Sequence, residues 1–174
     1  KFENMLSVIK LTGAELKKYL EYSYDEWIDN PSATGHLIKV NKRGRIINRV
    51  YNFDSAVGII YTVNPYKPMG ERVEIKSMQD GTPFDESRLY TVALSSYRYN
   101  GGGGHLTKGL GFSKEQIAER SVKNVLSDLR GLIMQDIIDM GGDIVIPEYN
   151  NWKFVPEAEV KQYIEKDREL LGVK

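Results

Sequence analysis

The sequence predicts an α+β fold. Segments with the 3.6-residue period of an amphipathic helix and segments with the alternating or β-branched character of strands are mixed along its 174 residues. They do not follow the strict strand–helix–strand order of a doubly wound parallel sheet. A chain of this length can bury one substantial core. We therefore interpret residues 1–174 as a single domain.

The first predicted elements are a strand and a helix. Residues 2–11 alternate loosely between apolar and polar side chains, which is typical of a strand. Thr12 and Glu15 have the spacing of a capping box, in which each side chain accepts a hydrogen bond from the other residue's backbone N–H. An apolar stripe follows and predicts a helix over residues 13–23.

The next segment, residues 24–49, is polar and rich in turn residues, so we expect a long irregular excursion. Within it, residues 41–45 form a small basic turn. Two interpretations stay open for this turn, namely a solvated hairpin or a contact to phosphate.

Three strands are predicted in the middle of the chain. Residues 57–63, 72–78 and 89–94 are rich in β-branched and aromatic side chains or alternate in polarity. Asp80 and Gly81 between them are typical of a tight turn or hairpin.

The last third of the chain predicts helices. Ser113 and Gln116 have capping-box spacing and open an apolar period that runs to Ile137, with Gly131 as a point where the helix can divide. Gly141 and Gly142 end this period. A short segment at residues 143–147 follows, and a last helix is expected to begin at Pro156 and to stop at Gly172.

Composition excludes several classes of protein. Lys plus Arg and Asp plus Glu both total 24, and no basic run occurs, which argues against a nucleic-acid polymer as partner but leaves single nucleotides open. The absence of cysteine excludes disulfides, thiolate metal sites and a cysteine nucleophile. No apolar run approaches the roughly 18–20 residues of a membrane span. The opening residues, KFEN, contain no signal peptide, and we expect the chain to be part of a larger protein.

The most distinctive stretch is residues 89–104, LYTVALSSYRYNGGGG, where a predicted strand runs into four glycines. Glycine lets a ligand approach the backbone closely, so we interpret the stretch as a binding loop, with a mobile loop as the alternative. It is not a P-loop, because Lys108 is followed by Gly109 and preceded by Thr107. The dinucleotide fingerprint also fails, because Leu106 stands where its last glycine would be.

Recognition is favoured over catalysis. The chain has two histidines, His36 and His105, and no HExxH motif, so it cannot supply a dinuclear metal centre, and neither histidine lies near a nucleophile elbow. Two aromatic pairs fall in predicted loops. Aromatic rings stack on nucleobases at roughly 1–3 kcal/mol per base, and a base held between two rings gains twice. Packing at strand ends is the alternative for both pairs, Tyr51 with Phe53 and Tyr97 with Tyr99.

Three segments together carry a family resemblance. They are MLSVIKLTGAELKKYLE, YNFDSAVGIIYTV and SSYRYNGGGG. In combination they resemble the C-terminal domain of the 5′-nucleotidase family. Within this family the motifs most resemble those of the 2′,3′-cyclic-nucleotide 2′-phosphodiesterase/3′-nucleotidase branch. The resemblance covers residue 2 to about residue 133. It implies a layered α/β/β/α domain with mixed sheets.

The resemblance also implies a function. Family members are extracytoplasmic hydrolases, periplasmic, secreted or on the cell surface, and an N-terminal domain absent from this chain holds two divalent metals. The C-terminal domain binds the nucleoside and clamps its base between two aromatic rings. These match Phe53, with Tyr51 as a close competitor, and Tyr97. The ribose is expected beside Asn100, Gly101, Gly102 and Gly103. The chain itself would then hold no catalytic residue and no metal ligand, bind nucleosides weakly and hydrolyse nothing.

Two departures from the family pattern matter. Gly103 stands where the common Gly-Gly-Asp-Gly pattern has an Asp that binds ribose hydroxyls. A missing carboxylate is compatible with a substrate that carries phosphate on its 2′ and 3′ oxygens. The family's Asn-x-Gly-Gly-x-Arg segment, which supplies a phosphate-binding arginine, does not occur. A non-catalytic carbohydrate- or protein-binding module is the alternative function.

Overall fold

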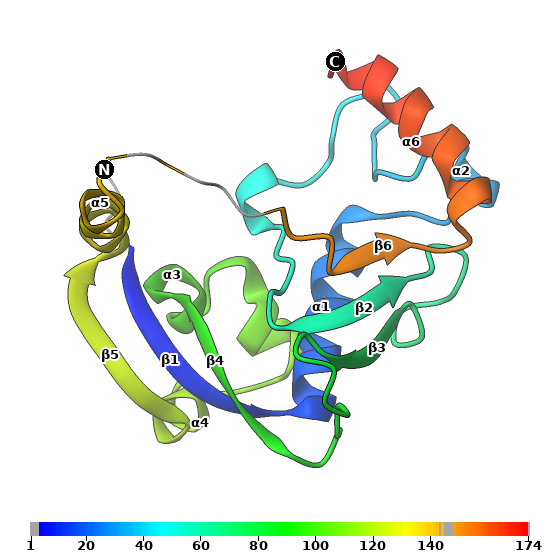
Figure 1. The fold of residues 1–174 in the computed structure, drawn as a ribbon. Coiled ribbons are helices and arrows are strands. Elements are labelled where there is room, and N and C mark those ends of the chain that lie inside the picture. The colour runs from blue at the N-terminus through cyan, green and yellow to red at the C-terminus, as the bar shows by residue number, and fades with distance from the viewer. Residues whose placement is uncertain (1–3, 143, 145–147, 174) are drawn as a thin grey trace. The chain divides into compact units, whose positions relative to one another are not determined.

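The computed structural model describes residues 4–142, 144 and 148–173 (Figure 1). Contacts within the chain divide it into two compact units. The first unit comprises residues 1–16 and 86–148, and the second comprises residues 17–85 and 149–174. Helix α1 (Gly13–Trp27) begins in the first unit and continues in the second.

The first unit is built on an antiparallel sheet in the order β4-β1-β5. The central strand β1 (Met5–Thr12) pairs with β4 (Leu89–Ser95) in a regular register and with β5 (Ser121–Asp128) in a register interrupted by two irregularities. Ile9 and Leu11 of β1 are fully buried. β1 is therefore the strand around which this unit's core forms.

Helical segments connect β4 to β5, and one more helix, α5, follows β5. They are α3 (Ser96–Tyr99), the 3₁₀ turn η2 (Gly102–Gly104), the wider turn η3 (His105–Gly109), α4 (Lys114–Glu119) and α5 (Leu129–Asp139). Leu106 of η3 and Ile117 of α4 are buried. Glu15 in the first turn of α1 forms a two-bonded ion pair with Arg120 just after α4, at 2.8 and 3.0 Å. This pair joins the start of α1 to the segment that leads into β5.

The second unit is built on a mixed sheet in the order β3-β2-β6. β2 (Ile59–Val63) pairs antiparallel with β3 (Val73–Met78) and parallel with the short β6 (Trp152–Phe154). Its other elements are the main part of α1, α2 (Pro31–Thr34), the 3₁₀ turn η1 (Val50–Asn52) and α6 (Glu157–Leu171). The most deeply buried apolar side chains of this unit are Leu20, Tyr24, Tyr61, Val63, Val73 and Val160.

The predicted α+β class is confirmed, and most predicted elements are present. The predicted helix at 13–23 extends to Trp27. Its capping box is confirmed by hydrogen bonds between Thr12 and Glu15 at 2.8 and 3.2 Å. The capping box of α4 is also present, between Ser113 and Gln116.

The predicted turns are found with some differences. The basic turn at 41–45 closes through an N–H of Asn41 that donates to the Arg45 carbonyl at 2.9 Å. Gly81 has φ 85°, but its turn ends β3 and joins no hairpin, because the next strand, β4, belongs to the other sheet. Pro156 caps α6 instead of starting it, and Gly172 (φ 65°) ends it as predicted. The short segment at 143–147 lies outside the described residues except for residue 144.

The helix predicted from residue 117 to residue 137 is wrong in its middle. Residues 121–128 form β5 instead, between α4 and α5. Apolar residues with helical spacing are not enough to fix a helix when a buried strand nearby has an unpaired edge. β1 has such an edge on the side away from β4, and β5 supplies the missing backbone partners.

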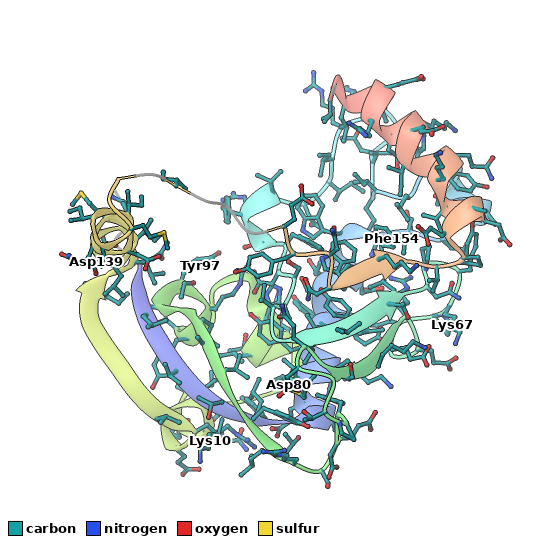
Figure 2. All side chains as sticks on the ribbon, viewed as in Figure 1. Lys10, Lys67, Asp80, Tyr97, Asp139 and Phe154 are labelled. Carbon is teal, nitrogen blue, oxygen red and sulfur yellow. The ribbon has the colours of Figure 1, made fainter. Side chains whose placement is uncertain are left out.

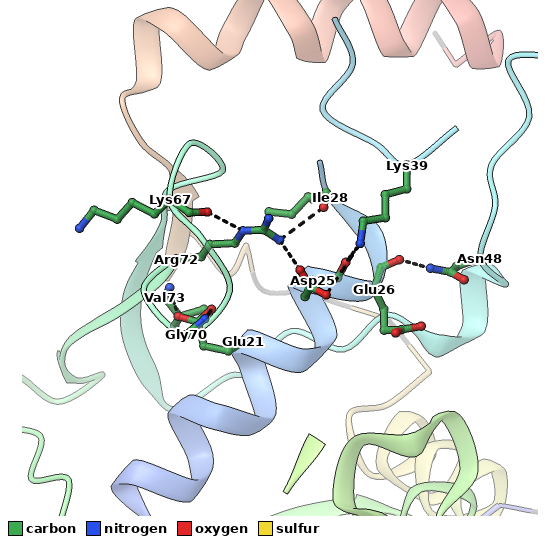
Figure 3. A network of polar contacts seen from close by, with 10 residues as sticks. All are labelled: Glu21, Asp25, Glu26, Ile28, Lys39, Asn48, Lys67, Gly70, Arg72 and Val73. Atoms are coloured by element: carbon green, nitrogen blue, oxygen red, sulfur yellow. Dashed lines mark hydrogen bonds and ion pairs between the residues drawn. The ribbon is translucent and has the colours of Figure 1, made fainter. Parts of the chain in front are cut away.

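A buried carboxylate ties α1 to β3 in the second unit (Figure 3). Glu21 is only 2% exposed and accepts hydrogen bonds from the N–H groups of Gly70 at 2.9 Å and Val73 at 2.6 Å. One turn further on, Asp25 pairs with the buried Arg72 at 2.9 Å. The Arg72 guanidinium also donates to the carbonyls of Lys67 and Ile28.

We expect Glu21→Ala to lower the free energy of unfolding by about 2–4 kcal/mol, because two backbone N–H groups lose their acceptor inside the unit. Urea unfolding followed by circular dichroism measures the change. Glu26→Ala on the same helix is the matched control, since its backbone carbonyl, not its carboxylate, accepts from Asn48. An equal loss in both variants would mean that the Glu21 carboxylate has no special role.

Candidate functional site

The glycine stretch forms a tight turn beneath an aromatic ring. β4 ends at Ser95, whose hydroxyl caps α3 by accepting from the N–H of Arg98 at 3.4 Å. α3 carries Tyr97 (Figure 2), and the chain then reverses direction through the glycines. Gly101, Gly103 and Gly104 have φ of 89°, 73° and 83°. Residues other than glycine, Asn and Asp rarely adopt this backbone region.

Gly102 lies directly against the Tyr97 ring. A Cβ placed on Gly102 would lie 2.4–2.6 Å from three atoms of that ring, far inside van der Waals contact. Because Gly102 is not among the glycines with positive φ, this crowding and not its backbone conformation explains the glycine. Tyr97 keeps 38% of its surface exposed. The turn therefore supports an aromatic ring that remains accessible.

Arg98 joins the ring to the turn. Its side chain is buried, with the residue only 4% exposed, and its guanidinium carbon lies 5.2 Å from the centre of the Tyr97 ring. Nη1 of the same guanidinium donates to the carbonyl of Gly102 at 3.2 Å. A cation over a ring and a hydrogen bond to the residue that supports this ring hold both in one arrangement.

The structure brings together the predicted residues of this turn. Asn100 follows α3, and its side-chain amide donates to the carbonyl of Ser96 at 2.8 Å. A Cβ on Gly101 would lie 3.2 Å from the Thr107 methyl group, so the turn packs closely on η3. Tyr97, Asn100, Gly101, Gly102 and Gly103 are thus parts of one compact feature.

The other predicted rings lie in the second unit. Tyr51 is 55% exposed, and its hydroxyl accepts from Arg49 Nη1 at 2.6 Å. Phe53 packs in an aromatic cluster, with ring centres 5.2 Å from Tyr24, 5.8 Å from Trp27 and 6.5 Å from Trp152. A sandwich between one of these rings and Tyr97 stays a prediction.

Three other side chains are deeply buried. His105 is fully buried and belongs to the core of the first unit. Tyr24 and Tyr61 share a buried hydrogen bond of 3.0 Å between their hydroxyls. Burial raises the pKa of both phenols above their ordinary value, so both stay neutral at physiological pH.

Sequence reasoning missed two features of the site. One is that Tyr97 rests on Gly102, and the other is that Arg98 contacts both. Tyr97, Arg98 and Gly102 fall within six residues of the sequence, so a contact among them was conceivable. It could not be used without the structure because the contact depends on how the glycines turn.

Among the residues that the structure describes, no three His, Asp or Glu side chains come together as a metal site. His36 contacts the carboxylate of Asp167, with Nδ1 2.6 Å from Oδ1. In the same described part of the chain, no helix combines the length and apolar character needed to cross a bilayer.

Comparisons with known proteins point in one direction. Residues 1–109 match the family model described as 5′-nucleotidase, C-terminal domain. The chain is 30% identical over 171 residues to the trifunctional nucleotide phosphoesterase protein YfkN of Bacillus subtilis, covering 89% of the chain and 10% of that protein. It is 28% identical over 173 residues to the 2′,3′-cyclic-nucleotide 2′-phosphodiesterase/3′-nucleotidase of Salmonella typhimurium, covering 89% of the chain and 24% of that protein.

Solved structures agree on the fold. A Staphylococcus aureus protein described as a 5′-nucleotidase, in complex with α-ketoglutarate, superposes with a TM-score of 0.66 at 23% identity, over 88% of this chain and 28% of that one. A 5′-nucleotidase precursor of Thermus thermophilus superposes with a TM-score of 0.53 at 20% identity, over 89% and 26%. The chain thus spans about a tenth to a quarter of the curated relatives it matches.

We expect Gly102→Ala to displace the Tyr97 ring and to lower the free energy of unfolding by about 1–3 kcal/mol, the usual effect of overpacking. Urea unfolding measures the stability, and ring signals of ¹³C-labelled tyrosine report the displacement, with Tyr97→Phe for assignment. Gly131→Ala in the first turn of α5 is the matched control, because its Cβ would meet nothing within 4 Å. The free energy of unfolding of that control should rise by up to about 0.5–1 kcal/mol, because alanine has a higher helix propensity than glycine. Unchanged Tyr97 signals in Gly102→Ala would contradict the contact.

Proposed function

Because the chain belongs to the 5′-nucleotidase C-terminal domain family, we propose that it is the nucleoside- and nucleotide-binding domain of a larger nucleotidase or 2′,3′-cyclic-nucleotide phosphodiesterase. The binding surface is the exposed ring of Tyr97 with the turn from Asn100 to Gly103. One observation carries this proposal most strongly. The ring of Tyr97 is both supported by Gly102 and accessible.

The chemistry of the turn suits a nucleoside. A nucleobase stacks on an accessible aromatic ring without needing particular hydrogen bonds, at roughly 1–3 kcal/mol per base. Three glycines beside that ring leave backbone without Cβ atoms, against which a ribose can come close. Asn100 is exposed and adds a polar side chain next to these glycines.

The parent protein would supply the hydrolysis. The relatives named above are phosphoesterases and nucleotidases, and most of their length lies outside the region that this chain matches. We propose that two divalent metals are held in that other part, that the parent is periplasmic or at the cell surface, and that this chain delivers the substrate. The chain by itself would bind without hydrolysing.

The second ring of the proposed sandwich has two candidates. Phe53 is held by its aromatic neighbours, which fixes its orientation but covers part of it. Tyr51 is the more exposed of the two. The proposal keeps both, and substitution separates them.

We expect adenosine to bind the chain with millimolar or tighter affinity, and Tyr97→Ala to weaken binding by roughly 5-fold to 150-fold, the equivalent of one lost stacking partner. Isothermal titration calorimetry measures both. Tyr99→Ala, two residues away on the same short helix, should bind normally. Parallel titrations of Tyr51→Ala and Phe53→Leu identify the second ring as the one whose loss weakens binding. Absence of adenosine binding, or equal affinity in Tyr97→Ala, would favour a carbohydrate- or protein-binding module instead.

Gly103 offers a test of the phosphate position. We propose that the missing carboxylate lets this site accept nucleotides that carry phosphate on the 2′ and 3′ oxygens. Gly103 has φ 73°, a conformation that Asp tolerates better than most residues, so Gly103→Asp should fold.

We expect Gly103→Asp to weaken binding of 2′,3′-cyclic AMP relative to 5′-AMP by roughly fivefold, since two like charges about 4 Å apart repel by about 1 kcal/mol even in water. Gly103→Asn has the same shape without the charge and should leave the ratio of affinities near that of the unmodified chain. An unchanged ratio in Gly103→Asp would contradict this assignment, while adenosine binding would still test the site itself.

A further inference from the structure

In the part of the chain that the structure describes, β4 pairs with β1 along one edge and with no strand along the other (Figure 1). The N–H and C=O groups of successive residues point to opposite edges of a strand. In β1, the N–H of Met5 donates to Ser96 Oγ just beyond β4, whereas the N–H of Lys10 donates to the carbonyl of Arg120 just before β5. The odd-numbered residues of β1 therefore face β4.

The register between the two strands shows which backbone groups of β4 lie on the open edge. Ile9 lies opposite Val92 and the register is uninterrupted, so the backbone of Val92 is paired with β1. Thr91 and Ala93 alternate with Val92, and their N–H and C=O groups therefore point outward. Both residues are exposed. Among the described residues, no hydrogen bond satisfies these outward groups.

The other outer strands of the two described sheets are protected from further pairing, whereas β4 is not. β3 carries the exposed charges of Glu74 and Lys76, β6 has three residues, and the register of β5 is interrupted by two irregularities. Charge, shortness and bulges are the usual means by which proteins keep edge strands from pairing. β4 has seven residues, LYTVALS, with no charge, no proline and a regular register. Its open edge is therefore suited to pairing.

From this contrast we propose that β4 pairs antiparallel with β4 of a second copy of this chain, so that two three-stranded sheets become one continuous sheet. A two-fold axis at Val92 gives the longest overlap, and it sets the outward groups of Thr91 in one copy opposite those of Ala93 in the other. The same register sets Tyr90 opposite Leu94. Apolar side chains meet apolar ones across the axis, and no like charges face each other.

A second copy fits this edge better than a flexible segment does. Its β4 is already extended and held by β1, so pairing requires no ordering of a disordered strand. In the two-fold register, all four outward N–H and C=O groups of Thr91 and Ala93 find partners. The inference is independent of nucleotide binding at Tyr97.

We expect sedimentation equilibrium to show a reversible dimer whose population rises with concentration in the submillimolar range. The double variant Thr91→Lys with Ala93→Lys sets like charges opposite each other at two places, so the dissociation constant of its dimer should rise roughly tenfold or more. Glu119→Lys is the matched control, because this exposed residue of α4 gives the same change of net charge away from the edge. It should dimerise as the unmodified chain does.

A charge-swap experiment separates loss of pairing from loss of folding. The double variant Thr91→Glu with Ala93→Glu should also be monomeric by itself. An equal mixture of the lysine and glutamate double variants should associate again as a heterodimer, because each introduced lysine then faces an introduced glutamate. A misfolded variant would not be rescued in this way.

Hydrogen exchange followed by NMR gives a second readout. The N–H groups of Thr91 and Ala93 should exchange more slowly as the concentration rises, and the N–H of Val92, which pairs with β1, is the internal control. Four outcomes would overturn the proposal: a monomer up to millimolar concentration, unchanged association of the lysine double variant, no rescue in the mixture, or slow exchange of Thr91 and Ala93 at every concentration. The last would show that another segment of the same chain covers the edge. Failure of adenosine binding would overturn only the proposed function.

Discussion

The two central strands need hydrogen-bond partners on both edges, and most of the architecture follows from this need. A buried backbone N–H or carbonyl without a partner is costly, so such strands are almost always paired. β1 is satisfied by β4 and β5, and β2 by β3 and β6. Both partners of β1, and β6 among the partners of β2, come from segments distant along the chain. Those distant strands close both units.

Buried side chains extend the same principle beyond the sheets. Glu21 accepts from two N–H groups at the start of β3 and just before it, and Asp167 accepts from two N–H groups in the segment after α2. Both carboxylates lie on helices and accept from backbone N–H groups that strand pairing leaves without an acceptor. A carboxylate can do this because it accepts several hydrogen bonds at once. These hydrogen bonds hold the irregular backbone at Leu37, Ile38 and Gly70 in place.

How far the sequence predicts the structure depends on whether the cause is local. The capping box of Thr12 and Glu15, the strand at 89–95 and the glycine stop at Gly172 follow from neighbouring residues, and all were predicted. β5 was missed because the free edge of β1 that it covers lies more than a hundred residues earlier. The residues of the glycine turn were predicted as a set, but the support of Tyr97 by Gly102 depends on the path of the turn. The residues that line an apolar pocket of the second unit come from separate segments between residue 27 and residue 173, so no short stretch of the sequence predicts this pocket.

The contact between Tyr97 and Gly102 also constrains the order in which this sequence can change. While position 97 carries a large ring, any side chain at position 102 lowers stability, because even one methyl group would overlap the ring. If position 97 first becomes small, position 102 is released, but a side chain that then appears there blocks the return of the ring. The loss of the ring is thus easily reversed at first and difficult to reverse later. A glycine at position 102 thus leaves position 97 open to an aromatic residue.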